Sequence, residues 1–449
     1  MAPVAVAGGG LAGTEAALAL AHRGHDVRLY EMRPQVGTPA HRTAVLGELV
    51  CTNSFKSELP ESAHGQLKRE MRCLGSALLD AADESRVPAG AALAVDRELF
   101  AAALQRCVEA HPRVEVVREE LRELPSGPAV VATGPLTSGA LTEAIATELG
   151  DDGLSFYDAI APIVHSDSID RSVVFAAGRY DQAADYLNCP LDASEYNAFV
   201  RALRAADRYE GHDWEEIPYF EGCLPIEEMA ERGHDTLRFG PMRPTGLQDP
   251  RTGRRPHAVV QLRREDRRGQ MLNLVGFQTR LRTGEQRRVF GMIPGLADAE
   301  FLRFGSIHRN TFLNFPGRLA PYGATPQRPD IVFAGQLTGV EGYTESAASG
   351  ILAAIVLDGI LADGEPPPLP PSDTMLGALY RYLRQANPDN FQPMNSNWGL
   401  VDPMPDAPRR KLDRRRALAA RADASFRRWA AGVGVAPSGD RCLAAATSA

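Results

Sequence analysis

The sequence predicts an α/β fold in which a Rossmann-type dinucleotide-binding domain carries an inserted α+β domain. Three observations favour this fold. A glycine-rich turn connects an apolar strand to a helix at the start of the chain, and a second strand–helix pair appears near residue 331. The segment between them, about 155–300, is richer in aromatic residues, arginine and turn signals, which indicates a different domain.

Apolar strands and helices follow one another in the first part of the chain, as a βαβ unit requires. In chain order, the predicted elements are strand 3–8, helix 11–23, strand 26–31, helix 97–110, strand 114–120 and strand 129–134. The middle of the chain has strand candidates in the segments HAVVQL and MLNLVGF. Near the end, DIVFAG predicts a strand and YTESAASGILAAIVLDGIL a long helix.

These patterns divide the chain into three segments. We expect residues 1–155 to form the first part of the dinucleotide-binding domain and 156–300 an inserted substrate-binding domain. Residues 301–449 complete the first domain and add a C-terminal segment, mainly helical over 373–430. The Pro-rich stretch 366–371 predicts a stiff linker.

Composition narrows the class of protein. The 449 residues are 44% hydrophobic and 24% charged, as in a globular enzyme. The start of the chain has no secretory signal. We therefore expect a cytoplasmic protein that does not span a membrane. The six cysteines form no C-x-x-C pair, which argues against a disulfide framework and a metal site. The net charge of −8 does not favour nucleic-acid binding on average. Arginines nevertheless cluster at 251–268 and 409–428, either as solvated faces or as basic surfaces for a partner.

The first glycine-rich turn has the spacing of a dinucleotide-binding loop. Gly8, Gly10 and Gly13 lie between the first strand and the first helix. Such glycines allow a tight turn, the approach of a diphosphate to the backbone, and close strand–helix packing. Glu31 ends the second strand, where a carboxylate accepts hydrogen bonds from a ribose.

Dinucleotide binding leaves NAD, FAD and S-adenosylmethionine as candidate ligands, and two distant segments favour FAD. One follows the strand at 129–134 and the other follows the strand near 331, where it leads into a second helix N-terminus. An extended cofactor bound by both ends of a chain is typical of flavoproteins. The sequence has no second G-x-G-x-x-G for NAD(P)H. The predicted residues are Ala132, Thr133, Gly134, Gly335, Gln336 and Gly342.

Ordered segments along most of the chain identify a family. They include VAVAGGGLAGTEAA, YEMRP, ELVCTNSFKSE, RVPAGAALAVDRELF, VVATGPLTS, GRYDQAADYLNCP, FEGCLPIEEMA, LRFGPMRPTGL, IHRNTFLN, GVEGYTESAASG and NFQPMNSNWGL. With these segments, residues 4–402 resemble the folate- and FAD-dependent tRNA (uracil-5-)-methyltransferases. Thr52 stands where the family has Ser about as often, and the segment after about 403 matches weakly.

The resemblance implies an activity. In this family 5,10-methylenetetrahydrofolate gives a one-carbon unit to the flavin, NAD(P)H supplies reducing equivalents, and the carbon passes to C5 of the T-loop uridine at tRNA position 54. The product is 5-methyluridine, and the partner is the T-arm of tRNA. Larger relatives that modify the wobble uridine are an alternative, although they usually carry a long C-terminal extension.

Two cysteines are candidate catalytic residues for such a reaction. C5 of uracil is a poor nucleophile until a thiolate adds to C6, and a base must later remove the C5 proton. Cys223 comes just before a predicted helix N-terminus, a context that favours a thiolate, and Cys51 follows an apolar run. The resemblance implies that both are catalytic and leaves the two roles open. The context slightly favours Cys223 as the nucleophile.

Other residues in the matching segments are candidates for ligand contacts. The resemblance favours His308 as the residue that stacks on the pterin ring of the folate, with Arg309 and Asn310 beside it. Lys56, Arg263 and Arg264 are candidates for folate or tRNA contacts. A flavin thiol oxidoreductase and a tRNA-binding flavoprotein that acts in RNA folding remain alternative functions, and the oligomeric state is not evident.

Overall fold

The parallel sheet that the sequence predicts forms the centre of the first domain. The computed structural model describes residues 2–150, 154–209 and 224–435. Five strands lie in the order β16-β7-β1-β2-β6, all parallel, with β1 paired to both β2 and β7. The strands are β1 (Val4–Ala7), β2 (Val27–Tyr30), β6 (Val114–Val117), β7 (Ala129–Val131) and β16 (Ile331–Phe333).

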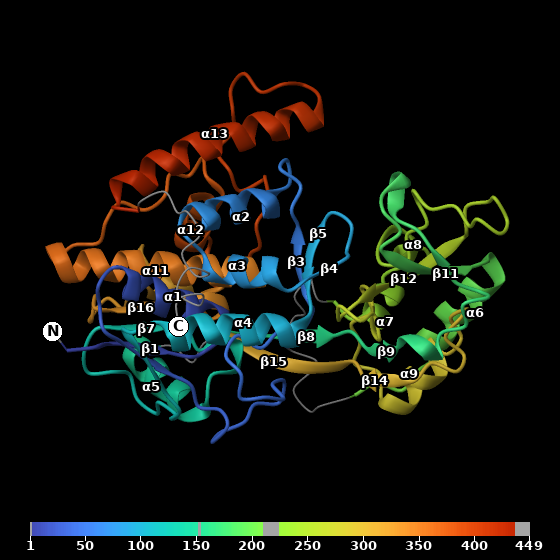
Figure 1. Cartoon of the computed structure of the whole chain (residues 1–449), viewed down its shortest axis with the longest axis horizontal. Coiled ribbons are helices and arrows are strands. Elements are labelled where there is room, and N and C mark those ends of the chain that lie inside the picture. The colour runs from blue at the N-terminus through green and yellow to red at the C-terminus, as the bar shows by residue number, and fades with distance from the viewer. Residues whose placement is uncertain (1, 151–153, 210–223, 436–449) are drawn as a thin grey trace.

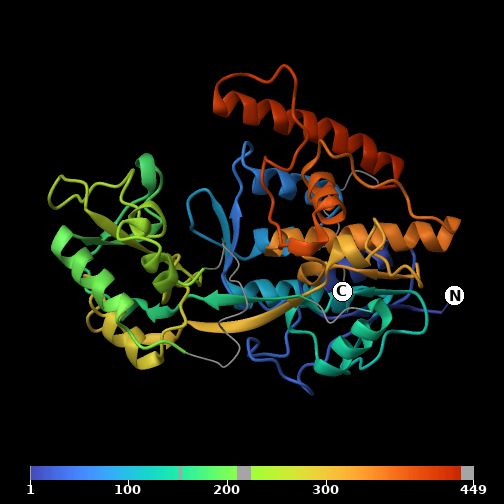
Figure 2. The ribbon, with the colours of Figure 1, turned by 180° about the vertical axis from the view of Figure 1, so that it is seen from behind.

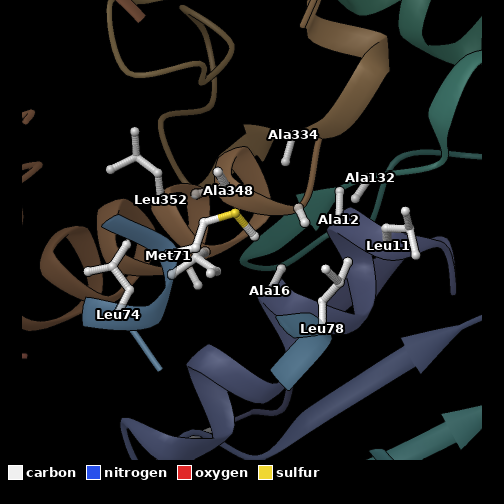
Figure 3. Close-up of a cluster of buried hydrophobic side chains, with 14 of the residues drawn as sticks. Leu11, Ala12, Ala16, Met71, Leu74, Leu78, Ala132, Ala334, Ala348 and Leu352 are labelled. Carbon is white, nitrogen blue, oxygen red and sulfur yellow. The ribbon is translucent and has the colours of Figure 1, made fainter. Parts of the chain in front are cut away.

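Two helices that are distant in the sequence cover one face of this sheet. Helix α1 (Leu11–His22) packs against α11 (Tyr343–Asp363), and small side chains at the contact, such as Ala12 and Ala16, allow the close approach seen in Figure 3. Helix α11 is long and apolar enough to cross a membrane, but 67% of its most apolar window is buried in the protein. It is therefore a core helix of this domain. Helix α5 (Gly139–Leu149) covers the other face (Figure 2).

A helical layer and a small antiparallel sheet complete the N-terminal part of this domain. Ser62, Ser76 and Asp96 begin three of the helices, because each side chain accepts a hydrogen bond from a backbone N–H of the first turn. The small sheet has the order β3-β5-β4. The elements are α2 (Ala63–Cys73), α3 (Ala77–Glu84), α4 (Arg97–Ala110), β3 (Ser54–Ser57), β4 (Arg86–Val87) and β5 (Ala92–Val95).

A two-stranded antiparallel ribbon, β8 (Leu154–Ile160) with β15 (Ser306–Phe312), connects the first domain to a second lobe (Figure 1). That lobe contains a six-stranded sheet of order β10-β11-β12-β13-β9-β14, whose apolar residues pack against its helices. Its strands are β9 (Ile163–His165), β10 (Phe175–Ala176), β11 (Tyr186–Leu191), β12 (Ala258–Arg264), β13 (Met271–Leu274) and β14 (Phe301–Arg303). Its helices are α6 (Ala193–Arg204), α7 (Ile226–Glu231), α8 (Thr236–Phe239) and α9 (Thr283–Phe290).

The chain returns from the second lobe to the first, as the sequence predicts for an inserted domain. After the short helix α10 (Phe315–Arg318) it completes the parallel sheet with β16 and then forms α11. Helices α12 (Met375–Gln385) and α13 (Lys411–Gly432) follow, and α13 lies over α2 (Figure 1). Between α12 and α13 the chain is irregular apart from one short turn of helix, so the predicted helical segment is two helices with a long connection.

Candidate active site

The glycine-rich turn brings β1, α1 and β7 closer together than side chains would allow. Gly8 has a φ of +101°, and a Cβ atom there would lie 2.6 Å from the carbonyl oxygen of Ala132. A Cβ atom on Gly13 would lie 1.8 Å from the carbonyl oxygen of Gly8. Both glycines are therefore required by the packing of the turn itself.

Gly10 has a different environment, because the space beside it is open. It forms the N-cap of α1 with an ordinary φ of −79°, and a Cβ atom there would meet no other atom within 4 Å. The space lies at a helix N-terminus, where N–H groups and the helix dipole favour an anion. This position suits the diphosphate of a dinucleotide, and a side chain on Gly10 would project into it.

Glu31 follows β2 and fixes the turn from the side. Its carboxylate accepts hydrogen bonds from the Gly9 N–H at 3.1 Å and from the Arg33 backbone N–H at 2.9 Å, and the Arg33 guanidinium donates two more. Burial raises the pKa of Glu31, but the hydrogen bonds and charge of Arg33 outweigh it and lower the pKa below its ordinary value. Glu31 is thus an ionised acceptor beside the glycine loop.

One pocket collects the predicted cofactor-binding residues from three distant segments. Its walls include the glycine loop, the turn after β7 and the turn after β16. An elongated ligand bound by all three segments fits this arrangement, as FAD would. The predicted residues in its lining are Gly8, Gly10, Glu31, Ala132, Thr133, Gly134, Gly335 and Gln336. Gly13 and Gly342 are outside the lining. Gly13 packs against the Gly8 backbone, and Gly342 is the N-cap of α11, next to Tyr343, which does line the pocket.

Cys51 lies in a loop next to this pocket, since Val50 and Tyr343 both belong to the lining. The Tyr343 hydroxyl oxygen accepts hydrogen bonds from the N–H groups of Cys51 at 2.8 Å and Thr52 at 3.2 Å. Burial is the main cause that raises the pKa of Tyr343, with a smaller contribution from Cys51, so its hydroxyl stays neutral.

Two arginines hold the same loop from the other side. Arg97 donates to the carbonyl oxygens of Leu49 at 2.6 Å and Cys51 at 3.1 Å, and Arg303 donates to that of Val50 at 2.7 Å. Arg303 comes from β14, so the second lobe contributes directly to the position of the Cys51 loop. Positive charge thus borders the loop on the side of both lobes.

A buried carboxylate organises the start of α11. Glu345 is fully buried; it accepts a hydrogen bond from the Ser396 N–H at 3.0 Å, and its oxygen lies 3.3 Å from His64 Nδ1 and 4.0 Å from Lys56 Nζ. Burial raises the pKa of Glu345, yet the charge of Lys56, with the contributions of His64 and Ser396, holds it well below its ordinary value. Lys56 itself has a φ of +61° and stays partly exposed beside Gly342.

Of the other candidate residues, some lie within the described part of the structure and others lie outside it. Cys223 lies outside the described residues. His308 is in β15, where it pairs with Asp158 of β8. Strand β15 contacts two turns of the pocket, Gly134–Leu136 and Gly335–Thr338. The side chains of His308, Arg309 and Asn310 lie outside the described part of the structure. Arg264 is exposed.

Arg263 has its partners inside the protein. The residue is 7% exposed, and its side chain donates to Asn53 Oδ1 at 3.1 Å and to Thr52 Oγ1 at 2.8 Å. It therefore connects the second lobe to the Cys51 loop, and a role in direct contact with RNA phosphates does not fit this burial.

Residues that shape the Cys51 loop were not among the sequence candidates. Tyr343, Arg97 and Arg303 contact the loop from three separate elements. Tyr343 and Arg97 belong to segments that carry the family resemblance, GVEGYTESAASG and RVPAGAALAVDRELF, which is a signal that could have drawn attention to them.

Comparisons with known proteins agree with this geometry. The family model described as Glucose inhibited division protein A matches residues 3–365. The methylenetetrahydrofolate–tRNA-(uracil-5-)-methyltransferase of Geobacter sulfurreducens is 55% identical, over 96% of this chain and 99% of its own length. An enzyme of the same name from Thermus thermophilus is 52% identical, over 96% of this chain and 97% of its own length.

A solved structure shows the same fold in a more distant protein. Aquifex aeolicus GidA superposes with a TM-score of 0.69 at 16% sequence identity, over 99% of this chain and 75% of that chain. The α/β fold with its parallel sheet and added antiparallel sheets is therefore that of GidA. By the family model and by its similarity to these relatives over nearly its whole length, the chain belongs to the Glucose inhibited division protein A family, and within it to the methylenetetrahydrofolate–tRNA-(uracil-5-)-methyltransferases.

Proposed function

We propose that this chain methylates C5 of the T-loop uridine at position 54 of tRNA, with a one-carbon unit from 5,10-methylenetetrahydrofolate and reducing equivalents from NAD(P)H. The observation that carries the proposal is one pocket in which the glycine loop and the turns after β7 and β16 meet Val50 and Tyr343, the neighbours of Cys51. The pocket suits FAD, and the adjacent loop provides a sulfur nucleophile or a base. We expect the enzyme to act in the cytoplasm, where its tRNA substrate is made.

The residues of the chain have distinct tasks in this proposal. Gly8, Gly10 and Gly13 shape the space for the diphosphate, and Glu31 supports the loop and accepts from the ribose. When bound, FAD would carry reducing equivalents from NAD(P)H and the one-carbon unit from the folate to the uracil. We propose that His308 contacts the pterin, because its strand passes the same two turns of the pocket.

Cys51 and Cys223 share the chemistry at the uracil. One thiolate forms a bond to C6, which makes C5 nucleophilic toward the methylene carbon. A base then removes the C5 proton as the methylene carbon separates from its carrier, and reducing equivalents that come from NAD(P)H convert the methylene group to methyl. The bond between sulfur and C6 breaks last and restores the ring. The proposal includes both cysteines and leaves open which forms the bond and which assists proton transfer.

The test is an assay with purified protein, FAD, methylenetetrahydrofolate, NAD(P)H and unmodified tRNA. We expect 5-methyluridine at position 54, and none in a matched tRNA with cytidine there. Modification of the wobble uridine instead would assign the chain the chemistry of the larger relatives. Flavin reduction or tRNA binding with no methylated uridine would contradict the proposal and favour a thiol oxidoreductase or an RNA-folding protein.

A further inference from the structure

A second pocket lies between the two lobes and shares no lining residue with the flavin pocket. The β4–β5 hairpin is on the side of the first lobe that faces the second (Figures 1 and 2). The Tyr186 hydroxyl donates to the Ala89 carbonyl oxygen at 3.0 Å, and Asp185 accepts from the Gly90 N–H at 2.7 Å, so the two lobes are in contact here. The lining consists of Ser57, Ala89, Ala91, Ala92, Arg179, Gln182, Tyr186 and Gln261.

Arg179 brings a positive charge to this pocket without a carboxylate partner in the described part of the chain. Its guanidinium donates to Gln261 Oε1 at 3.1 and 2.9 Å and to the Thr245 carbonyl oxygen at 2.7 Å, all neutral acceptors. Burial lowers the pKa of Arg179, and the nearby charge of Arg243 lowers it further. A half-buried cation fixed by neutral groups next to a second cation favours an anionic ligand.

The amide that orients Arg179 is itself fixed. Gln261 donates to Asn188 Oδ1 at 3.0 Å, and the fully buried Asn188 donates to the carbonyl oxygens of Phe175 and Ala177. This chain of hydrogen bonds leaves the Arg179 guanidinium little freedom. The site for an anion is therefore preorganised by the sheet of the second lobe.

Tyr180, the residue after Arg179, presents an exposed aromatic ring outside the lining of the pocket. Its backbone is left-handed, with a φ of +56°, and its N–H donates to the Gly246 carbonyl oxygen at 2.9 Å. A Cβ atom on Gly246 would lie 3.1–3.2 Å from three adjacent atoms of the Tyr180 ring. Nearly equal distances to three ring atoms place Gly246 against the face of the ring. Yet Tyr180 is 65% exposed, so the ring is supported on one side and open on the other.

This combination of strain and exposure requires a reason. A non-glycine residue with positive φ and a large exposed aromatic ring both cost free energy, and such features cluster at binding sites. The carboxylate tail of a folate would use the charge of Arg179 but not the exposed ring. A nucleotide uses both, because its base stacks on an aromatic face and its phosphate binds guanidinium groups.

The position of the pocket relative to Cys51 also suits the RNA substrate. Tyr186 of the pocket is paired across β11 and β12 with Arg263. Arg263 in turn donates to the hydroxyl of Thr52, the residue after Cys51. One buried side chain thus separates the second pocket from the loop of the candidate catalytic cysteine.

We propose that Tyr180, Arg179 and Arg243 bind one nucleotide of the substrate tRNA outside the flavin pocket, with a base stacked on Tyr180 and a phosphate at the two arginines. The inference rests on the proposed function, since it takes tRNA to be the substrate. The ring and the charge hold a neighbouring part of the RNA while the target uridine reaches the Cys51 loop.

The test measures tRNA affinity of FAD-loaded Tyr180→Ala and Tyr180→Phe enzymes over a series of salt concentrations. Because Tyr180→Ala removes the ring on which the base stacks, it should weaken binding by about 5- to 150-fold, while Tyr180→Phe stays near the wild type. Tyr180→Gly, which suits the positive φ, should bind as weakly as Tyr180→Ala. Tyr209→Ala, an exposed tyrosine in the same lobe, is the matched control and should bind normally.

Arg243→Gln tests the phosphate contact, since Arg243 is exposed and its loss should not disturb folding. The slope of log affinity against log salt should decrease by about one. FAD content and the KM for methylenetetrahydrofolate should stay unchanged in all these variants.

Two results would overturn the inference. One is unchanged tRNA affinity in Tyr180→Ala and Tyr180→Gly. The other is a raised KM for methylenetetrahydrofolate with normal tRNA binding, which would assign the pocket to the folate tail. Failure of the proposed function would look different, because wild-type enzyme would then bind tRNA without making 5-methyluridine, and the binding measurements would still decide the role of Tyr180.

Discussion

At the scale of single residues, some glycines of the glycine-rich turn are required for packing, whereas another leaves space for a ligand. A side chain on Gly8 or Gly13 would collide with backbone atoms, whereas one on Gly10 would meet open space. Substitution of the first two therefore tests folding, and substitution of Gly10 tests binding. Cys51 differs again, because Tyr343 and Arg97 hydrogen-bond its own backbone and Arg303 hydrogen-bonds the carbonyl oxygen of the preceding residue, Val50.

The Gly10→Val enzyme should fold but fail to retain FAD. The φ of −79° is normal for any residue, and the valine side chain would occupy the space for the diphosphate. Absorbance of the purified protein and chromatography of the released flavin measure this, and wild-type protein should release FAD rather than FMN. Gly284→Val, in open space in the first turn of α9, is the matched control and should keep its flavin. A yellow Gly10→Val protein with normal FAD content would contradict the assigned diphosphate position.

The two cysteines should respond differently to tRNA that carries 5-fluorouracil at position 54. Fluorine does not leave C5 as a cation, so the sulfur–C6 bond cannot break and a protein–RNA adduct should survive denaturation in the complete reaction. Replacing the nucleophile with alanine should abolish the adduct. Replacing the other cysteine should stop turnover and permit some adduct, provided that FAD is still bound.

Gel electrophoresis of Cys51→Ala and Cys223→Ala reactions then assigns the roles. Adduct in Cys51→Ala and none in Cys223→Ala identifies Cys223 as the nucleophile, and the reverse pattern identifies Cys51. Cys189, fully buried in the second lobe with a pKa that burial raises to about 12, provides the control, since Cys189→Ala should form adduct normally. Full activity with both Cys51 and Cys223 replaced would remove thiolate catalysis from the reaction.

At the scale of elements, buried glutamates connect the helices of the first domain. Glu15 of α1 accepts from Ser76 Oγ and from the Leu78 N–H at the start of α3, and Glu70 of α2 accepts from the N–H groups of Met375 and Leu376 at the start of α12. These carboxylates satisfy N–H groups that have no partner within their own helix. Each one therefore joins two helices that are distant in the sequence.

The stability of the protein should depend on pH through Glu15. Burial raises its pKa from 4.5 to about 7, although hydrogen bonds from Ser76, Leu78 and Ala77 act in the opposite direction. The unfolded chain loses this proton near pH 4.5 and the folded chain near pH 7. The stabilising contribution of the protonated group is thus fully present below about pH 4.5 and is lost as the pH rises to 7.

Urea unfolding at pH 5 and pH 8 measures the effect. Between these values Glu15→Gln should gain about 3 kcal/mol relative to the wild type, because glutamine carries no charge at either pH. Glu98→Gln, an exposed position in the first turn of α4, should follow the wild type. An equal pH dependence in Glu15→Gln and wild type would show that Glu15 does not change its protonation in this range.

The elements of the first domain were largely predictable because their signals are local. Helix α4 spans the predicted residues 97–110, and α1 ends one residue before the predicted end. The sheet β3-β5-β4 was not predicted, since β3 has the largely polar sequence SFKS and β4 has only two residues, so neither carries an apolar run. The contacts of Cys51 were also beyond sequence reasoning, because Tyr343 is 292 residues away along the chain. The spacing of the glycines located the turn between β1 and α1 that lines the pocket, whereas the contacts of Arg97 depend on the tertiary structure.

At the scale of the whole molecule, the second lobe is coupled to the Cys51 loop through charged side chains. Glu265 follows β12, is fully buried and forms an ion pair with Arg97, whose guanidinium also donates to the carbonyl oxygens of Leu49 and Cys51. Arg263, two residues earlier, reaches Thr52 in the same loop. The proposed nucleotide site on the second lobe is therefore linked through buried side chains to the loop that contains Cys51.

Glu265→Gln should destabilise the protein and slow methylation together. Removing one partner of a buried ion pair typically costs about 3–5 kcal/mol, because the other charge stays buried without compensation. Calorimetry and the rate of 5-methyluridine formation measure the two effects. Glu285→Gln, which breaks a surface ion pair with Arg288 in the same lobe, should change neither stability nor the methylation rate by much.

The double variant Arg97→Met with Glu265→Leu separates the contribution of Arg97 to stability from its contribution to the position of the Cys51 loop. It should recover part of the lost stability, since both charges of the Arg97–Glu265 pair are removed together, but methylation should stay slow because Arg97 no longer holds the Cys51 loop. Recovery of both stability and methylation would contradict a positioning role for Arg97.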